Sequence, residues 1–107
     1  MYKNEVTLNG VISSDPFIRE MWGENATFFT LDNRRKWISR GDTTHSKKNT
    51  FNIIAINNNL QINKGDKVSI TGELDVYEWG VEGIKKHKTQ ILCQKIEIIN
   101  TVGQEIF

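Results

Sequence analysis

The chain has 107 residues, of which 37% are hydrophobic and 25% are charged. These values fit one folded domain with a single core and argue against a disordered protein. The formal net charge is only +1, which argues against a protein that wraps duplex DNA through a large overall positive charge. Any site for a polyanion must therefore be local.

Membrane and secretion signals are not evident. No apolar run approaches the roughly 18 residues that a membrane span needs, and residues 1–5 lack the apolar core of a signal peptide. Cys93 is the only cysteine, which excludes an internal disulfide and is compatible with a reducing compartment. It lies in an apolar run, so we interpret it as a buried small side chain rather than a reactive thiol. We expect a soluble, cytoplasmic protein.

The first half of the chain reads as short strands. Residues 6–12 alternate between apolar and polar side chains, which predicts a half-buried strand, and Gly10 inside it predicts a sharp bend. We expect a hairpin from residues 17–21 and 26–31, with residues 22–25 as its turn. Phe28 and Phe29 are adjacent, so in a strand they face opposite ways, and parity leaves open whether Phe28 stacks on a ligand or contacts another subunit.

The middle of the chain contains one long irregular segment and one clear strand. Residues 37–49 show no apolar periodicity, so they form either a long loop or the open tip of a hairpin. Residues 50–56 alternate, with Phe51, Ile53 and Ala55 on one face. A short helical connector is expected near residues 58–63, before the next strand.

The last third predicts a second hairpin. Residues 67–77 alternate, with Gly72 as another bend and Tyr77 opposite the apolar stripe. Residues 79–83 read as the tip, and a last strand runs over about residues 85–99. Together these elements predict an all-β, five-stranded OB-fold barrel over residues 1–100, with long hairpin loops and a short tail at 101–107.

Two basic clusters adjoin aromatic side chains. Six of the fifteen residues from 34 to 48 are basic, and only Asp42 among them is acidic. The first cluster is Arg34, Arg35, Lys36, Arg40, Lys47 and Lys48, and the second is Lys85, Lys86 and Lys88. Aromatic rings interleaved with cations suit single-stranded nucleic acid, because rings stack on bases and cations bind phosphates. Tyr77 and Trp79 could line a groove with Phe51.

Several short motifs, in the same order along the chain, resemble those of a known protein family. The run from Val6 to Ile12, Asp15-Pro16 with Arg19, and the later landmarks Trp37, Gly72 and Trp79 resemble bacterial and mitochondrial single-stranded DNA-binding proteins over about residues 4–99. The resemblance implies an OB fold that binds single-stranded DNA without reading its sequence, usually as a homotetramer. It also implies that Trp37, Phe51 and Trp79 stack on bases.

The chain departs from this family pattern in several places. Asn57 replaces a family aromatic, Asn52 stands where a histidine often lies at the subunit interface, and the connector between the third and fourth strands is short. The end of the chain, residues 103–107, lacks the acidic, proline-containing tip through which most bacterial members recruit partners. A dimer or a tetramer is therefore expected. A chain without this tip is similar to the phage, plasmid or mitochondrial members of the family, or to the primosomal group.

The sequence thus predicts a single-stranded DNA-binding protein that acts in replication, recombination or repair. Two alternatives stay open: a primosomal-type adaptor that acts mainly through replication proteins, and an RNA-binding OB domain. An enzyme is not expected, since no catalytic constellation can be identified. Neither a metal nor another cofactor is expected, because His45, His87 and Cys93 are scattered. Trp22 could be structural or a rim contact.

Overall fold

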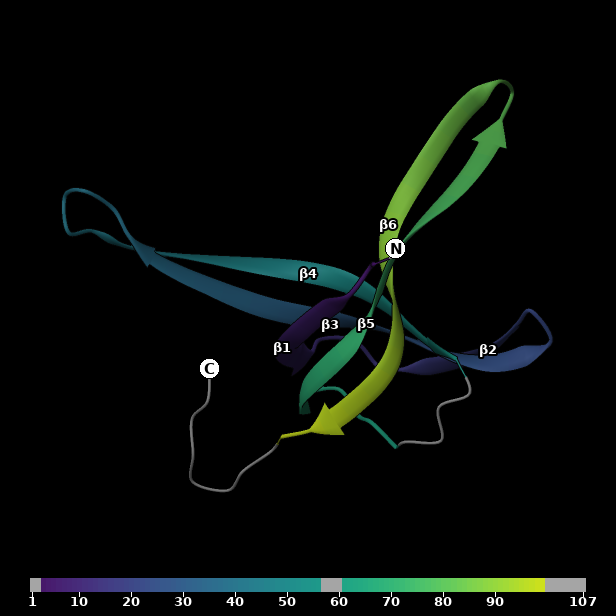
Figure 1. Cartoon of the computed structure of the whole chain (residues 1–107), viewed down its shortest axis with the longest axis horizontal. Coiled ribbons are helices and arrows are strands. Elements are labelled where there is room, and N and C mark those ends of the chain that lie inside the picture. Colours follow the sequence, from purple (N-terminus) through teal and green to yellow (C-terminus); the bar gives the residue numbers. More distant parts are fainter. Residues whose placement is uncertain (1–2, 57–60, 100–107) are drawn as a thin grey trace.

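The computed structural model describes residues 3–56 and 61–99, and these residues form β-strands and no helix. Six strands follow one another along the chain (Figure 1). They are β1 (Val6–Ile12), β2 (Phe17–Met21), β3 (Glu24–Ile38), β4 (Thr44–Ile56), β5 (Lys67–Val81) and β6 (Ile84–Ile98). The predicted all-β class is confirmed.

Five of the strands close into a barrel. The sheet order is β1-β5-β6-β4-β3-β2, and β1 also pairs with β3 at Val11 and Ile12, which closes a ring of five strands and leaves β2 outside it. Neighbouring strands are antiparallel except β4 and β6, which are parallel. This closed five-stranded arrangement matches the Greek-key barrel of OB folds, and β2 adds a sixth strand beside the first part of β3.

The interior of the barrel is apolar and tightly closed. Its buried cluster is Ile12, Phe29, Leu31, Ile53, Ala55, Val68, Ile70, Ile91, Cys93 and Ile96. Gly10 and Gly72 lie where two backbones approach closely: a Cβ atom would collide with the carbonyl oxygen of Asp32 at the first position and of Leu92 at the second. Gly72 also adjoins a shift in the β5–β6 register. Both predicted bends therefore coincide with places that only glycine fits.

Two hairpins turn in only two residues. Trp22 and Gly23 have φ angles of 53° and 77°, and Glu82 and Gly83 have 53° and 81°. Positive φ at both central residues defines a type I′ turn, whose twist matches that of the flanking strands. The turn expected over residues 22–25 is thus two residues shorter, and β3 begins at Glu24. This shift changes which side chains face each other across β2 and β3.

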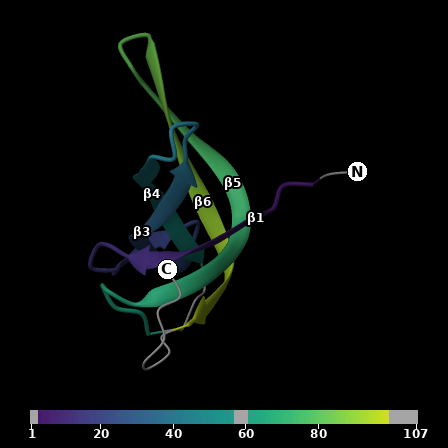
Figure 2. The same cartoon turned by 90° about the vertical axis from the view of Figure 1, so that its left-hand side faces the viewer.

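Three hairpins project from the barrel in different directions (Figures 1 and 2). The radius of gyration is 16.2 Å, compared with about 13 Å for a spherical chain of this length. Residues 37–49 form a hairpin rather than a loop, since β3 extends to Ile38 and β4 starts at Thr44. The described part of the expected helical connector, residues 61–63, contains no helix, and a turn follows at residues 64–65. Residues 57–60 and the expected tail, residues 101–107, lie outside the described chain.

Candidate nucleic-acid interface

An open groove of about 610 Å³ lies where the β2–β3 and β5–β6 hairpins leave the barrel. It is lined by Phe17, Arg19, Met21, Phe28, Ile54, Tyr77, Trp79, Lys88 and Gln90. Four of these nine residues are aromatic, and two carry a positive charge. We call this site the groove.

One wall of the groove comes from the β2–β3 hairpin. The two-residue turn sets Phe17 directly opposite Phe28, so the two side chains lie on one face of the ladder. Their rings stack with centroids 5.4 Å apart and planes inclined by 9°. The guanidinium of Arg19 lies 5.4 Å from the ring centre of Phe17. Phe17 is 49% exposed, so this wall presents an aromatic ring with an adjacent cation.

The β5–β6 hairpin forms the other wall. Tyr77 and Trp79 are two residues apart on β5 and therefore share a face, and their rings stack at 5.6 Å with a 29° inclination. Lys88 is opposite Tyr77, and Lys86 is opposite Trp79. Both lysines thus accompany the aromatic face, whereas Lys85 is opposite Gly80 on the other face of the hairpin.

The floor of the groove is buried but separate from the barrel core. Ile54 is only 3% exposed and does not belong to the core cluster, because its side chain points away from Ile53 and Ala55. Gln90 is 8% exposed, and its Nε2 donates a hydrogen bond of 2.9 Å to Asp75 Oδ2. The burial of Ile54 and the hydrogen bond of Gln90 hold the floor of the groove in place between the two aromatic walls.

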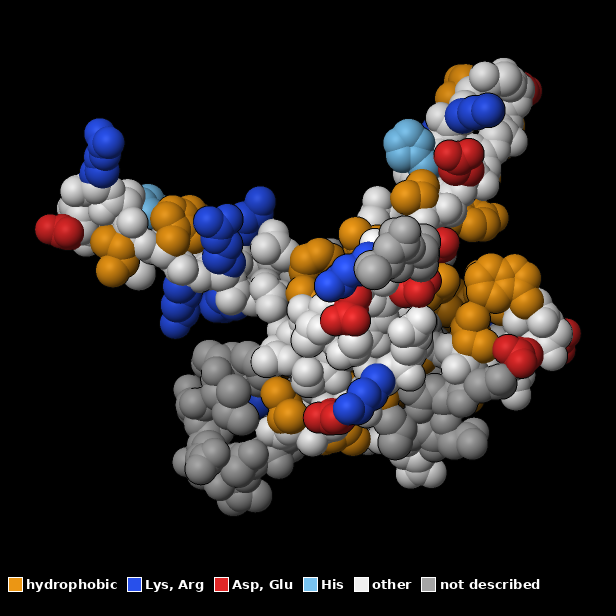
Figure 3. Space-filling model, in the orientation of Figure 1, with side chains coloured by type: hydrophobic (Ala, Val, Ile, Leu, Met, Phe, Trp, Pro, Cys, Tyr) orange, Lys and Arg blue, Asp and Glu red, His pale blue; other side chains and the backbone are white. Residues whose placement is uncertain are grey.

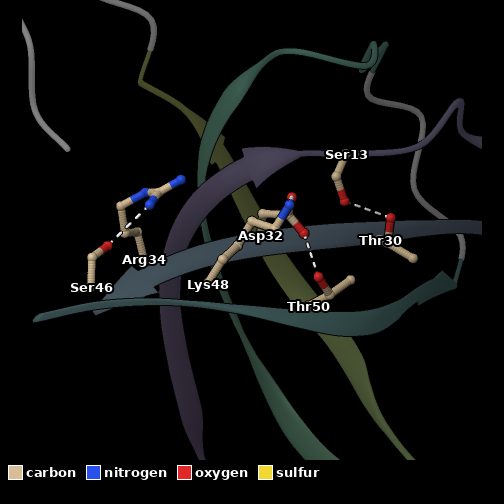
Figure 4. Close-up of polar contacts among 7 residues, drawn as sticks. All are labelled: Ser13, Thr30, Asp32, Arg34, Ser46, Lys48 and Thr50. Carbon is tan, nitrogen blue, oxygen red and sulfur yellow. Dashed lines mark hydrogen bonds and ion pairs between the residues drawn. The ribbon is translucent and has the colours of Figure 1, made fainter. Parts of the chain in front are cut away.

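A second hollow of about 270 Å³ continues the groove over Thr30 and Asn52. Further along the same face of the β3–β4 ladder lie the pairs Asp32–Thr50 and Arg34–Lys48. Figure 4 shows these side chains in a row along the two strands. The same outer face of the ladder therefore runs from the groove to the projecting part of β3 and β4, with Ser13 lying against Thr30 along it.

Asp32 lies in the middle of this row. Thr50 Oγ1 donates a hydrogen bond of 2.7 Å to Asp32 Oδ1, and Lys48 Nζ lies 3.8 Å from Asp32 Oδ2 (Figure 4). The hydrogen bond from Thr50 is the largest cause and lowers the pKa of Asp32 below its ordinary value of 3.8. Burial opposes this effect, and Ser13 and Lys48 add smaller contributions that lower the pKa. The carboxylate is therefore ionised at neutral pH.

We call residues 33–49, the projecting part of the β3–β4 hairpin, the basic arm. Arg34 is opposite Lys48, and Arg35 is opposite Lys47 on the next rung, so the cations occupy both faces of the ribbon. The basic residues of the arm are Arg34, Arg35, Lys36, Arg40, Lys47 and Lys48, and all six are exposed. Figure 3 shows them gathered along the arm, which points away from the β2–β3 hairpin.

Trp37 and Phe51 do not reach the groove. Trp37 stacks on His45 with ring centroids 5.2 Å apart, and the Arg35 guanidinium lies 5.2 Å from the Trp37 ring centre. Phe51 is opposite Leu31, half-buried and packed against the core. Trp37 lies six positions along β3 from Leu31, the partner of Phe51, so Trp37 and Phe51 are about 20 Å apart along the strand.

The predicted site residues therefore separate into groups. Tyr77, Trp79 and Lys88 line the groove and Lys86 shares its face, whereas the first basic cluster and Trp37 lie on the basic arm. Sequence reasoning missed Phe17, Arg19, Met21, Ile54 and Gln90, and it left the role of Phe28 open. A two-residue turn at Trp22-Gly23 was the available signal, because it alone sets Phe17 opposite Phe28.

The described residues add two negative findings. Within residues 3–56 and 61–99, no group of three or more His, Cys, Asp or Glu side chains is arranged to hold a metal ion. The same part of the chain has no helix of the length and apolar character that could cross a membrane.

Comparison with known proteins agrees with this fold. Residues 3–99 match the model of the single-strand binding protein family. A Plasmodium falciparum protein solved in complex with single-stranded DNA superposes with a TM-score of 0.83 at 21% identity, over 94% of this chain and 97% of that chain. At such identities the likeness concerns the fold.

Two bacterial structures are also similar. A deletion mutant of the single-stranded DNA-binding protein from Thermus aquaticus gives a TM-score of 0.81 at 18% identity, covering 95% of this chain but only 53% of that one. The small single-stranded DNA-binding protein from Streptomyces coelicolor gives 0.68 at 19% identity, over 92% and 96% of the two chains. The present chain thus spans about half the length of the Thermus protein.

Proposed function

This chain belongs to the single-strand binding protein family, and from that premise we propose that it binds single-stranded DNA without reading its sequence. The observation that carries the proposal is the groove, where two stacked aromatic pairs face a space of about 610 Å³. The role would be to protect exposed strands during replication, recombination or repair.

Base stacking supplies most of the proposed affinity. In a single strand the bases are free to stack on protein rings, and each such contact contributes about 1–3 kcal/mol whatever the base. We assign this role to Phe17, Phe28, Tyr77 and Trp79, which line the groove. A wall made of rings with few hydrogen-bonding groups fits binding that does not depend on sequence.

The phosphates would be held by cations beside the rings. Arg19 and Lys88 line the groove, and Lys86 shares the face of Trp79. Each phosphate contact releases counterions, so affinity should fall as salt rises. We assign no catalytic step to the chain: the proposed action is binding alone, in the cytoplasm, where phage, plasmid or chromosomal strands become exposed.

We also propose that the protein is a homo-oligomer, a dimer or a tetramer. β1 is paired with β5 over residues 6–11 but with β3 only at Val11 and Ile12. Over residues 6–10, no described strand covers the second edge of β1, although Asn33 Nδ2 donates a 2.7 Å hydrogen bond to the Asn9 carbonyl. An open edge of this kind can pair with the same edge of a second copy. Mass measurement in solution, with and without DNA, tests this state.

The groove assignment is tested by fluorescence anisotropy with labelled oligo-dT. The double variant Y77A/W79A should weaken binding by about 30-fold or more, because two stacking platforms are removed. The double variant L74A/V76A is a matched control: these exposed residues lie on the same hairpin but on its opposite face. Equal losses in both variants would show that the aromatic face is not the binding surface.

Two further outcomes would redirect the proposal. If oligo-U competes as well as oligo-dT, the groove accepts RNA equally, because stacking by itself does not discriminate the two sugars. If oligo-dT binds more weakly than micromolar without any partner protein, an adaptor of the primosomal type explains the chain better. Tight binding of oligo-dT by the protein alone supports the proposal as stated.

A further inference from the structure

We propose that Gln90 accepts a hydrogen bond from the amino group of one base held in the groove, so that one position of the strand favours a base such as adenine or cytosine. The inference rests on the proposed function of the groove and adds a specificity-determining residue to it. The other positions are held by stacking and charge alone, so the strand as a whole is still bound whatever its sequence.

Gln90 has an unused acceptor at the floor of the groove. The side chain is 8% exposed, and within residues 3–56 and 61–99 its one hydrogen bond is the 2.9 Å bond from Nε2 to Asp75 Oδ2. Its Oε1 therefore has no donor. In the same part of the chain, no side-chain nitrogen or oxygen of a buried or half-buried residue is both closed to solvent and without a hydrogen bond. Oε1 is thus open to the groove that Gln90 lines.

Asp75 fixes which end of the amide is left for a ligand. An ionised carboxylate accepts hydrogen bonds and donates none, so the amide turns its nitrogen toward Asp75 and its oxygen away. A glutamine without such a partner can rotate its amide by half a turn and offer either a donor or an acceptor. The pairing with Asp75 removes that freedom, and the floor offers the acceptor.

The distribution of charge in the groove directs a base, rather than a phosphate, to this floor. The walls are the two stacked aromatic pairs, and the two cations that line the groove, Arg19 and Lys88, are exposed. The floor holds the Gln90 oxygen with the Asp75 carboxylate beside it. A phosphate is repelled by these oxygens and attracted by the cations. A nucleotide bound here therefore presents the edge of its base to Gln90.

Gln90 also lies where a stacked base can reach it. Its partner across the β5–β6 ladder is Asp75, two residues from Tyr77 on the same face of β5. Two residues along a strand span about 7 Å, a separation that a base stacked on Tyr77 can bridge. Gln90 lines both the groove and the second hollow of about 270 Å³ that continues it.

An acceptor at the floor selects among bases by their edges. Adenine carries an amino group at N6 and cytosine carries one at N4, and the N6 amino group is one that glutamine binds in duplex DNA. Thymine carries the O4 oxygen at the corresponding place, which would meet the Gln90 oxygen with no hydrogen between them. A buried acceptor that stays unpaired costs binding free energy. Thymine should therefore be disfavoured at this one position.

The experiment uses an oligo-dT of about eight nucleotides in which the central base is adenine, purine without the amino group, cytosine or thymine. Adenine and purine have the same ring system, so the ratio of their affinities isolates the amino group. The variants are Q90L and Q90M, which remove the amide but keep much of the side-chain volume, and D75N, which releases the orientation of the amide. Q94L removes an exposed glutamine of β6 outside the groove and is the matched control. Binding is measured by fluorescence anisotropy.

The wild-type protein and Q94L should bind the adenine probe about three- to tenfold more tightly than the purine probe, the usual effect of one hydrogen bond. The cytosine probe should exceed the thymine probe by a similar factor. Q90L and Q90M should abolish both preferences. D75N should reduce the preference for cytosine over thymine, because a turned amide can donate to the thymine O4. Each ratio is taken within one protein, so a general loss of affinity in a variant cancels.

Two results would overturn the proposal. One is equal affinity of the wild-type protein for the adenine and purine probes, and the other is an unchanged ratio in Q90L or Q90M. Failure of the proposed function looks different: the protein would bind none of the four probes, or Y77A/W79A would bind all four as the wild-type protein does. If Y77A/W79A weakens all four while the wild-type protein shows no preference, the groove binds DNA and only the assignment of Gln90 is wrong.

Discussion

The groove and the basic arm are made from the same structural device, a β-hairpin that continues beyond the barrel, yet they present different chemistry. In the groove, residues on one face of each hairpin are aromatic and stacked in pairs. In the arm, consecutive rungs carry cations on alternate faces, and the tryptophan is paired with its own neighbours. The comparison shows how strand alternation sets the chemistry of a hairpin: rings on every second residue line one face, and cations on consecutive residues charge both faces.

The largest effect should separate the aromatics of the two regions. Phe17→Ala removes an exposed ring of the groove and should weaken oligo-dT binding by about 1–3 kcal/mol, the usual contribution of one base stack. Trp37→Ala removes a ring that lies on the basic arm, outside the groove, and should cost less than about 0.5 kcal/mol of the binding free energy of an oligo-dT that is short enough to occupy the groove alone. Anisotropy titrations measure both. If Trp37→Ala is as damaging as Phe17→Ala, the distinction between the two regions is wrong.

The next effect concerns Asp32, the acidic residue on the outer face of β3 and β4 between the groove and the basic arm. Its pKa is lower in the folded than in the unfolded chain, so its contribution to the free energy of unfolding is complete above pH 3.8 and is lost as pH falls through the lowered value. Thr50→Val should remove about 1 kcal/mol at neutral pH and raise the pKa of Asp32 toward its ordinary value.

Urea unfolding and NMR titration of the Asp32 carboxyl check this prediction. Thr7→Val, an exposed threonine on β1, serves as the control for the loss of a hydroxyl group. In Asp32→Asn the acid-sensitive part of the stability should be absent. An unchanged carboxyl pKa in Thr50→Val would show that the hydrogen bond does not set it.

The smallest effect has opposite signs for stability and binding. Lys47→Glu replaces a like-charge pair with an opposite-charge pair across from Arg35 and should stabilise the arm by about 0.2–1 kcal/mol. Amide hydrogen exchange in residues 33–49 should slow, while the affinity for a long oligo-dT falls because a cation is lost. Lys47→Gln should give a smaller gain in protection. Faster exchange in Lys47→Glu would mean that the repulsion between these side chains is already relieved in the free protein.

Much of the fold could be predicted from the sequence. Alternation located the five strand regions, and Gly10 and Gly72 marked the two close backbone approaches, because apolar periodicity and glycine both report contact with the core. The same logic fails where a strand leaves the barrel. Leu74 and Val76 continue the apolar stripe of β5, but they are 51% and 54% exposed, since the hairpin there has no core to cover.

The site was harder to predict because it depends on register. A turn of two residues rather than four moves the partner of Phe17 from Thr30 to Phe28, and the sequence alone did not fix that length. Phe51 was expected to stack on bases, but its parity with Ile53 and Ala55 turns it toward the core. Lys85 was grouped with Lys86 and Lys88, although one step along a strand changes the face.

Each of the three hairpins that project from the barrel carries one of the three tryptophans of the chain. Trp22 lies at the β2–β3 turn, Trp37 on the basic arm and Trp79 on the β5–β6 hairpin. Their side chains are 68%, 38% and 39% exposed. Variants that keep a single tryptophan and replace the other two by phenylalanine would each emit from one hairpin only. The molecule thus contains its own set of optical reporters, and the order in which they respond would trace the route of DNA across its surface.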